Sequence, residues 1–203
     1  MAYTFQGQDI VAPFQLSSNE PVFSADTVNL RVRRVKQGAQ RWEMEFKVVM
    51  QDPSSTFADM LTTFHDAVTL EMPQLNVRGE VISSGTSTGA ITTFSGAEPA
   101  GDDTIAISGL VTGTTINKGR FIKFSSHDKI YMVTETVTGD GSDFLKIYPS
   151  LRQQITSGDQ VLYRDNVDAI TFTAYRDIDN TQGITYADGI LSDLGTINLI
   201  EAL

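Results

Sequence analysis

The chain has 203 residues, of which 40 % are hydrophobic and 20 % are charged, a composition typical of a globular protein and not of a disordered or fibrous one. It contains no cysteine, which excludes disulfide scaffolds, thiol catalysis and cysteine-ligated zinc sites. The formal net charge of −10 repels the phosphates of nucleic acids, so we expect no general DNA or RNA binder.

Two stretches near the N-terminal end have the pattern of β-strands. Apolar and polar residues alternate over residues 28–33 and again over residues 42–50, and this period of two is typical of strands with one buried face. A short connection with a glycine, residues 37–40, lies between them, so we expect the two strands to pair as a long antiparallel hairpin. The buried face of the second strand is predicted to consist of Trp42, Met44, Phe46, Val48 and Met50.

One α-helix is expected after this hairpin. Asp52 or Ser54 is suited to cap its N-terminus, and Pro53 fits its first turn. Apolar residues then recur at helical spacing, at Phe57, Met60, Leu61 and Phe64.

Glycine is unevenly distributed along the chain. Eleven of the sixteen glycines lie between Val77 and Arg164, together with most of the serine and threonine runs. A shift in composition at both ends of a segment indicates an inserted module. We therefore expect residues 77–164 to form a domain inserted into a discontinuous first domain of residues 1–76 and 165–203.

Short strands separated by turn residues are expected within this insert. They are predicted over residues 104–110, 119–124, 130–137, 144–148 and 160–163, with a helical turn over 150–155. Strands this short and this regularly spaced favour a small closed or nearly closed barrel. Two further strands, over 169–175 and 196–200, are expected to pair with strands of the first segment.

Basic residues gather in one part of the chain. Six of the fifteen lie between residues 31 and 47, and the last 39 residues carry seven acids and a single base, Arg176. The simplest interpretation is that both groups form solvated strand faces. The alternative is that a basic edge of one copy meets an acidic edge of the next, which makes the basic set a candidate subunit interface. These residues are Arg31, Arg33, Arg34, Lys36, Arg41 and Lys47.

No constellation of catalytic or metal-binding residues stands out. Ser125, Ser126, His127 and Asp128 contain the residue types of a triad, but catalytic triads assemble from distant segments and not from neighbours in one loop. The acidic stretch 177–183 fails the spacing of a calcium loop, which needs glycine at its sixth position. We expect no catalytic residue, no cofactor, no metal and therefore no enzyme.

Aromatic residues of the predicted barrel are a candidate platform for stacking bases. Most of them alternate into the apolar set of their strands, so we expect them in the core. They are Phe121, Phe124, Tyr131, Phe144 and Tyr148.

Several stretches resemble a known family. Residues 124–131 (FSSHDKIY), followed by residues 145–151 (LKIYPSL), resemble the inserted domain of distal tail proteins from long-tailed siphophages. Residues 74–79 (QLNVRG) resemble the crossing into that insert, and the last five residues (LIEAL) are similar to the family's closing strand. The resemblance is strongest from residue 74 to the end, and before that it lies in the order of the elements.

This resemblance implies a fold, an assembly and a location. The fold class is mainly β, with a ring-forming β-sandwich first domain that has one α-helix and an inserted OB-like β-barrel domain. Six copies form a homohexameric ring that joins the tail tube protein to the hub protein of the tail tip or baseplate. DNA is only passing cargo in the channel. The protein is assembled in the host cytoplasm, resides in the virion and does not insert into a membrane.

Two other functions fit the same sequence. The major tail tube subunit shares a related sandwich, but it stacks into long tubes where a distal adaptor stops at one ring. A carbohydrate-binding module for host recognition is the second alternative, and exposed aromatic side chains on one face of the barrel favour it.

Overall fold

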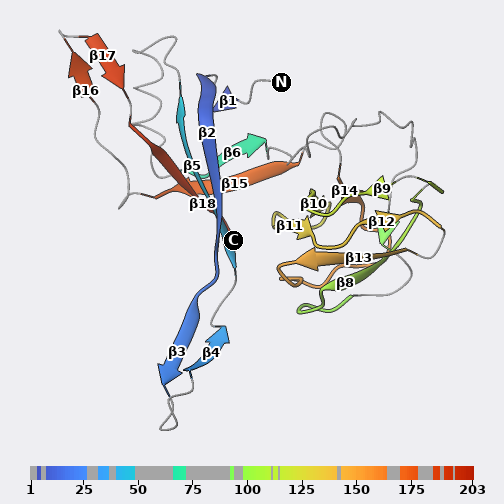
Figure 1. Ribbon diagram of the computed structural model, residues 1–203. Coiled ribbons are helices and arrows are strands. Elements are labelled where there is room, and N and C mark those ends of the chain that lie inside the picture. The colour runs from blue at the N-terminus through green and yellow to red at the C-terminus, as the bar shows by residue number, and fades with distance from the viewer. Residues whose placement is uncertain are drawn as a thin grey trace. The chain divides into compact units, whose positions relative to one another are not determined.

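The structure, a computed structural model, contains strands and no helix in the part of the chain that it describes, and the protein is mainly β as expected (Figure 1). The helix expected after residue 52 lies outside the described residues. Those residues are 4–5, 8–26, 32–36, 40–48, 66–71, 92–93, 98–110, 112–113, 115–140, 143–163, 170–177, 185–187, 190–193 and 195–203.

The chain divides into two compact units. Unit 1 comprises Met1–Leu70 and Thr173–Leu203, and unit 2 comprises Glu71–Phe172. The junctions therefore lie at 70/71 and 172/173, six and eight residues outside the insert expected over 77–164. That each unit folds by itself stays a prediction.

A six-stranded sheet with the order β1-β2-β5-β18-β15-β6 contains the first and last parts of the chain. Strand β5 lies inside it and pairs antiparallel with β2 on one side and β18 on the other. The expected pairing of the C-terminal strands with the first segment is thus confirmed. The strands are β1 (Thr4–Phe5), β2 (Gln8–Asn19), β5 (Arg41–Val48), β6 (Val68–Glu71), β15 (Thr171–Arg176) and β18 (Ile197–Glu201).

Alternation along β5 decides which face of this sheet is buried. Trp42, Met44 and Phe46 are at most 4 % exposed, whereas Glu45 and Lys47 are exposed. The Phe46 ring meets Phe5 edge-to-face at 5.4 Å between ring centroids. The predicted buried face is confirmed at these three positions; Val48 is half-buried, and Met50 lies outside the described residues.

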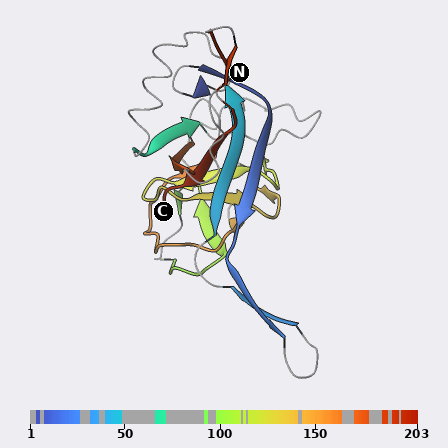
Figure 2. The ribbon, with the colours of Figure 1, turned by 90° about the vertical axis from the view of Figure 1, so that its left-hand side faces the viewer.

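The long hairpin exists, but its strands pair differently from our expectation. Strand β4 (Val32–Lys36) pairs with β3 (Val22–Asp26) and not with β5, while β5 pairs with β2. The paired residues of the two arms are therefore 8–26 on one side and 32–36 with 41–48 on the other. Of the connection expected at 37–40, residues 37–39 lie outside the described residues. Figures 1 and 2 show the ribbon of β3 and β4 continuing beyond the ends of β2 and β5.

A bulge interrupts the pairing of β2 with β5. Val11 is opposite Lys47 and Gln15 is opposite Glu45, so three residues of β2, 12–14, stand where β5 has only Phe46. Pro13 lies in this bulge, where its missing N–H removes no regular ladder bond. Phe14 of the same bulge stacks on Phe46 at 6.3 Å between centroids, which joins the bulge to the core.

Unit 2 contains a second six-stranded sheet, with the order β14-β10-β11-β13-β8-β7, and a short pair of β9 and β12. The five strands expected in this region are all present, although the one predicted over 130–137 is divided into β11 and β12. Their bounds are β7 (Thr92–Thr93), β8 (Thr104–Ser108), β9 (Thr115–Ile116), β10 (Phe121–Phe124), β11 (Ile130–Val133), β12 (Val137–Thr138), β13 (Asp143–Tyr148) and β14 (Val161–Leu162).

One buried cluster forms the core of unit 2. It takes side chains from each of the strands β8 to β14 and from segments between them. Its members are Ile105, Ile107, Leu110, Ile116, Ile122, Phe124, Tyr131, Val133, Val137, Leu145, Ile147, Leu151, Ile155, Val161 and Tyr163.

The helical turn expected over residues 150–155 is wrong. Ile155 instead forms an isolated antiparallel bridge with Glu98, with N···O distances of 3.1 Å in both directions. The Arg152 N–H donates to the hydroxyl of Tyr131 at 3.2 Å. These long-range bonds take the place of the local bonds that a helical turn would form. One further antiparallel pair, β16 (Thr185–Ala187) with β17 (Ile190–Asp193), lies in unit 1.

Replacing Phe46 with alanine should destabilise unit 1 by about 3–5 kcal/mol, because it removes a fully buried ring and leaves a cavity. Glu45→Ala, at the neighbouring exposed position, should change the free energy of unfolding by less than ~0.5 kcal/mol. Urea unfolding followed by circular dichroism measures both. Equal losses would show that the wrong face of β5 has been assigned to the core.

Residues 71–172 expressed alone should fold, because the core cluster of unit 2 lies wholly within them. We expect a cooperative thermal transition and a β-type circular dichroism spectrum. A fragment that stays unfolded, while the whole chain is folded under the same conditions, would contradict the division into independent domains.

Candidate interaction surface

Buried polar side chains hold the root of the long hairpin, where β5 begins. Glu201 is 2 % exposed, and its Oε2 accepts the backbone N–H of Trp42 at 3.1 Å. Gln40, 3 % exposed, donates from Nε2 to the hydroxyl of Ser18 at 3.0 Å. Because a buried polar group is costly unless it is hydrogen-bonded, these contacts specify one arrangement of the two arms at this point.

Half of the candidate interface residues lie on the β3–β4 ribbon. Arg33, Arg34 and Lys36 are on β4, opposite Ala25, Ser24 and Val22 respectively. Arg31 lies outside the described residues. In the described part of the chain, β3 and β4 pair only with each other.

The other two basic residues, Arg41 and Lys47, lie on the exposed face of β5. Between them on this face are Glu43 and Glu45, so the strand presents two acids flanked by two bases. The five basic residues that lie on described strands are thus divided between two elements, three on β4 and two on β5. Glu43 and Glu45 alternate onto the same face of β5 as Arg41 and Lys47, which a count of charges along the sequence misses.

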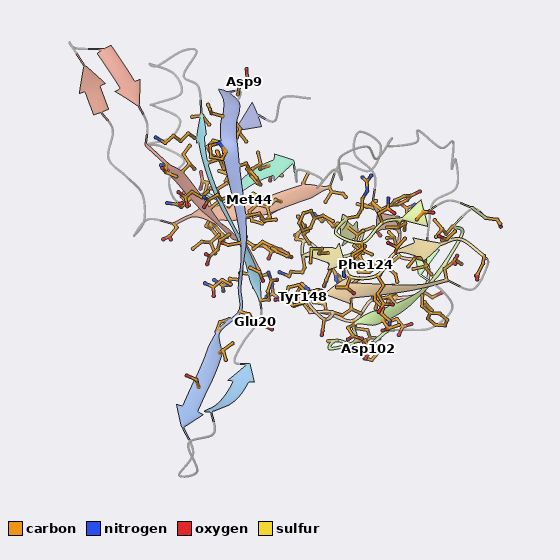
Figure 3. All side chains as sticks on the ribbon, viewed as in Figure 1. Asp9, Glu20, Met44, Asp102, Phe124 and Tyr148 are labelled. Atoms are coloured by element: carbon orange, nitrogen blue, oxygen red, sulfur yellow. The ribbon has the colours of Figure 1, made fainter. Side chains whose placement is uncertain are left out.

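A shallow hollow of about 310 Å³ lies on the exposed side of the six-stranded sheet. Its lining residues are Gln15, Ser17, Glu43, Met44, Glu45, Asp177, Asn198, Leu199 and Ile200. The Asn19 amide donates to Glu43 Oε1 at 2.6 Å and fixes one of these carboxylates. Two of these acids are on β5 and the third follows the end of β15, and only Asp177 belongs to the acidic C-terminal segment noted in the sequence. Figure 3 labels Met44 of β5, which also lines the hollow.

Arg176 adjoins this surface on β15. Burial lowers the pKa of its guanidinium from the ordinary value. An arginine begins so far above neutrality that it remains a cation at physiological pH. It is the single base of the last 39 residues, and it is half-buried.

The residues of the triad-like stretch do not converge. His127 is buried, with Nδ1 3.4 Å from the Tyr131 hydroxyl and Nε2 3.3 Å from the Gln154 carbonyl oxygen. Ser126 instead donates to Asp159 Oδ2 at 2.7 Å.

The remaining members of the stretch also have other partners. Ser125 Oγ accepts the Gln160 N–H at 3.0 Å, and Asp128 pairs with Lys123 at 3.1 Å. Each side chain of the stretch therefore holds a loop in place, and the arrangement offers no activated nucleophile.

Neither a metal site nor a membrane-spanning helix is found among the residues that the structure describes. No group of three or more histidine, aspartate or glutamate side chains is placed there to hold a metal ion. No described helix is long and apolar enough to cross a bilayer. Most of the calcium-loop-like stretch 177–183 lies outside the described residues.

The aromatic residues of unit 2 divide into two groups. Phe121, Phe124 and Tyr131 are at most 1 % exposed, and their expected place in the interior is confirmed (Figure 3 labels Phe124). Phe144 is 61 % exposed, which contradicts our expectation for this residue, and Tyr148 is half-buried.

Comparison with models of known protein families gives no match. A comparison with curated protein sequences also gives no significant match.

Removing the Glu201 carboxylate should destabilise unit 1, because the buried Trp42 N–H loses its acceptor. For Glu201→Met, of similar size, we expect a loss of about 1–3 kcal/mol in urea unfolding. Glu201→Gln keeps an acceptor oxygen and should lose less. Glu135→Met, at an exposed site on unit 2, is the matched control and should fall within ~0.5 kcal/mol of the parent. Equal stability of Glu201→Met and the parent would contradict the anchoring role of this carboxylate.

Proposed function

We propose that this protein is a structural subunit of a phage tail, a distal adaptor that forms a homohexameric ring between the tail tube protein and the hub of the tail tip or baseplate. In this proposal unit 1 is a ring-forming β-sandwich and unit 2 is an OB-like β-barrel. The protein performs no catalysis and binds no cofactor. DNA passes the ring only as cargo.

The observation that carries the proposal is the β3–β4 ribbon at the end of the long hairpin. An isolated two-stranded ribbon is at best marginally stable in water. Its strands find no third partner among the described residues, although its root is anchored by Gln40 and Glu201. A ribbon that is anchored at one end and unpaired at both edges is suited to pack on a neighbouring subunit.

Charge supports the same arrangement. The ribbon carries Arg33, Arg34 and Lys36, and the hollow on the sheet is lined by Glu43, Glu45 and Asp177. Contact between the ribbon of one copy and the acidic face of the next is heterologous, and a heterologous contact that closes on itself produces a ring. Such complementarity sets orientation and encounter rate more than affinity, so the ring should weaken as salt is raised.

The resemblance of the sequence to distal tail proteins supplies the place of this ring in the virion. The major tail tube subunit is the second candidate within the same class of protein. Electron microscopy of the purified protein distinguishes them: an adaptor stops at single rings, whereas a tube subunit polymerises into long tubes.

Reversing two charges on the ribbon should disrupt the ring. We expect native mass spectrometry at low salt to detect six-membered species for the parent and mainly monomers for Arg33→Glu/Arg34→Glu. The control Lys118→Glu/Arg152→Glu reverses two exposed bases of unit 2 and changes the net charge equally, from −10 to −14. This control should assemble like the parent.

Three results would contradict the proposal. They are a parent that stays monomeric at every concentration, a ribbon variant that assembles as well as the parent, and a control that dissociates to the same extent. Circular dichroism of each variant establishes that it is folded.

A further inference from the structure

Phe144 is the most exposed large hydrophobic side chain among the described residues, at 61 %. It lies on β13, where Leu145 and Ile147 belong to the buried core and Phe144 and Lys146 are exposed. Burying an aromatic ring removes a large apolar area from water, so exposure of this ring on a regular strand is unfavourable for the isolated chain. A single exposed apolar ring is common on protein surfaces, so its meaning here depends on the side chains around it.

The neighbours of Phe144 leave its ring accessible. Across the ladder it is opposite Ala106 of β8, which has only a methyl group with which to cover it. Two residues further along β13, Lys146 is opposite Thr104 and its Nζ lies 2.8 Å from Glu135 Oε1. Tyr148, half-buried, follows at the end of the strand (Figure 3). The exposed Phe144 ring is therefore near the Thr104 hydroxyl and the Lys146–Glu135 ion pair, which is itself about half-exposed.

The surroundings of the ring distinguish between classes of ligand. A protein partner buries a contiguous apolar area, and here the exposed neighbours are polar or small. A nucleic acid requires basic surface, and unit 2 has twelve acids against eight bases, a net charge of −4. A neutral saccharide needs an aromatic face for its C–H groups and a few polar side chains for its hydroxyls.

We propose that the exposed face of β13 and β8 is a binding site for neutral saccharide chains. Phe144 is the stacking platform, and Lys146, Glu135 and Thr104 supply hydrogen bonds to sugar hydroxyls. The Lys146–Glu135 pair offers both donors and acceptors while adding no net charge, which fits an uncharged ligand. This site is separate from the ribbon and the sheet of unit 1, so it does not depend on the proposed ring.

Affinity electrophoresis of the full chain tests the site. The protein is run in native gels that contain one of a panel of neutral polysaccharides: dextran, glycogen, mannan, galactomannan or the neutral O-polysaccharide of a bacterial lipopolysaccharide. We expect at least one to retard the parent. Phe144→Ala should weaken this retardation about tenfold or more, measured as the polysaccharide concentration for half-maximal effect. Phe144→Trp should bind at least as well as the parent.

Tyr175→Ala is the matched control, because it removes a comparably exposed aromatic ring, 51 % exposed, from unit 1. It should be retarded like the parent, and thermal melting should give similar transitions for all variants because both rings are exposed. The inference is overturned if the parent passes every gel unretarded or if Phe144→Ala binds as well as the parent. It is also overturned if Phe144→Ala instead abolishes binding to a single-stranded oligothymidylate, which would assign the face to nucleic acid.

Discussion

Pairing of β5 on both of its edges organises the first unit. One edge pairs with β2, from the beginning of the chain, and the other pairs with β18, from its end. Met44 of β5 is opposite Leu16 of β2 on one edge and Leu199 of β18 on the other. The buried face of β5 is therefore completed only when both neighbouring strands pair with it in this register. The first unit is discontinuous in sequence for this reason. Residues 71–172 form unit 2, and the chain segments before and after them pair in one sheet.

Much of the secondary structure could be predicted because its signals are local. The alternation over residues 42–48 indicates both the strand and its buried face, and glycines and turn residues separate the strands of unit 2. The loop roles of Ser125, Ser126 and Asp128 were consistent with the rule that adjacent residues rarely form a triad. These predictions needed no knowledge of which strands meet.

The features that could not be predicted depend on long-range pairing. The glycine connection at 37–40 has the composition of a hairpin turn, but β4 pairs with β3 and β5 pairs with β2, so the two strands next to this connection do not pair with each other. The separation of Arg41 and Lys47 from the ribbon bases follows from the same pairing. On β13, Phe144 and Leu145 are adjacent apolar residues, so alternation alone leaves open which of them faces inward. In the structure Leu145 and Ile147 belong to the buried core, and the Phe144 ring is therefore on the exposed face of the strand.

The pair of β9 with β12 and the pair of β10 with β11 belong to two sheets but follow the same register. Ile116 is opposite Val137 and Phe121 is opposite Met132, so the interruption between the two pairs contains the same number of residues on each arm. Gly119 lies in this interruption with φ of 88°, a left-handed conformation that allows the chain to bend there. An insertion or deletion of one residue on one arm would move every later side chain to the opposite face of the sheet. Length changes in this segment should therefore survive in evolution only when both arms change together, unlike changes in the loops at the ends of the hairpin.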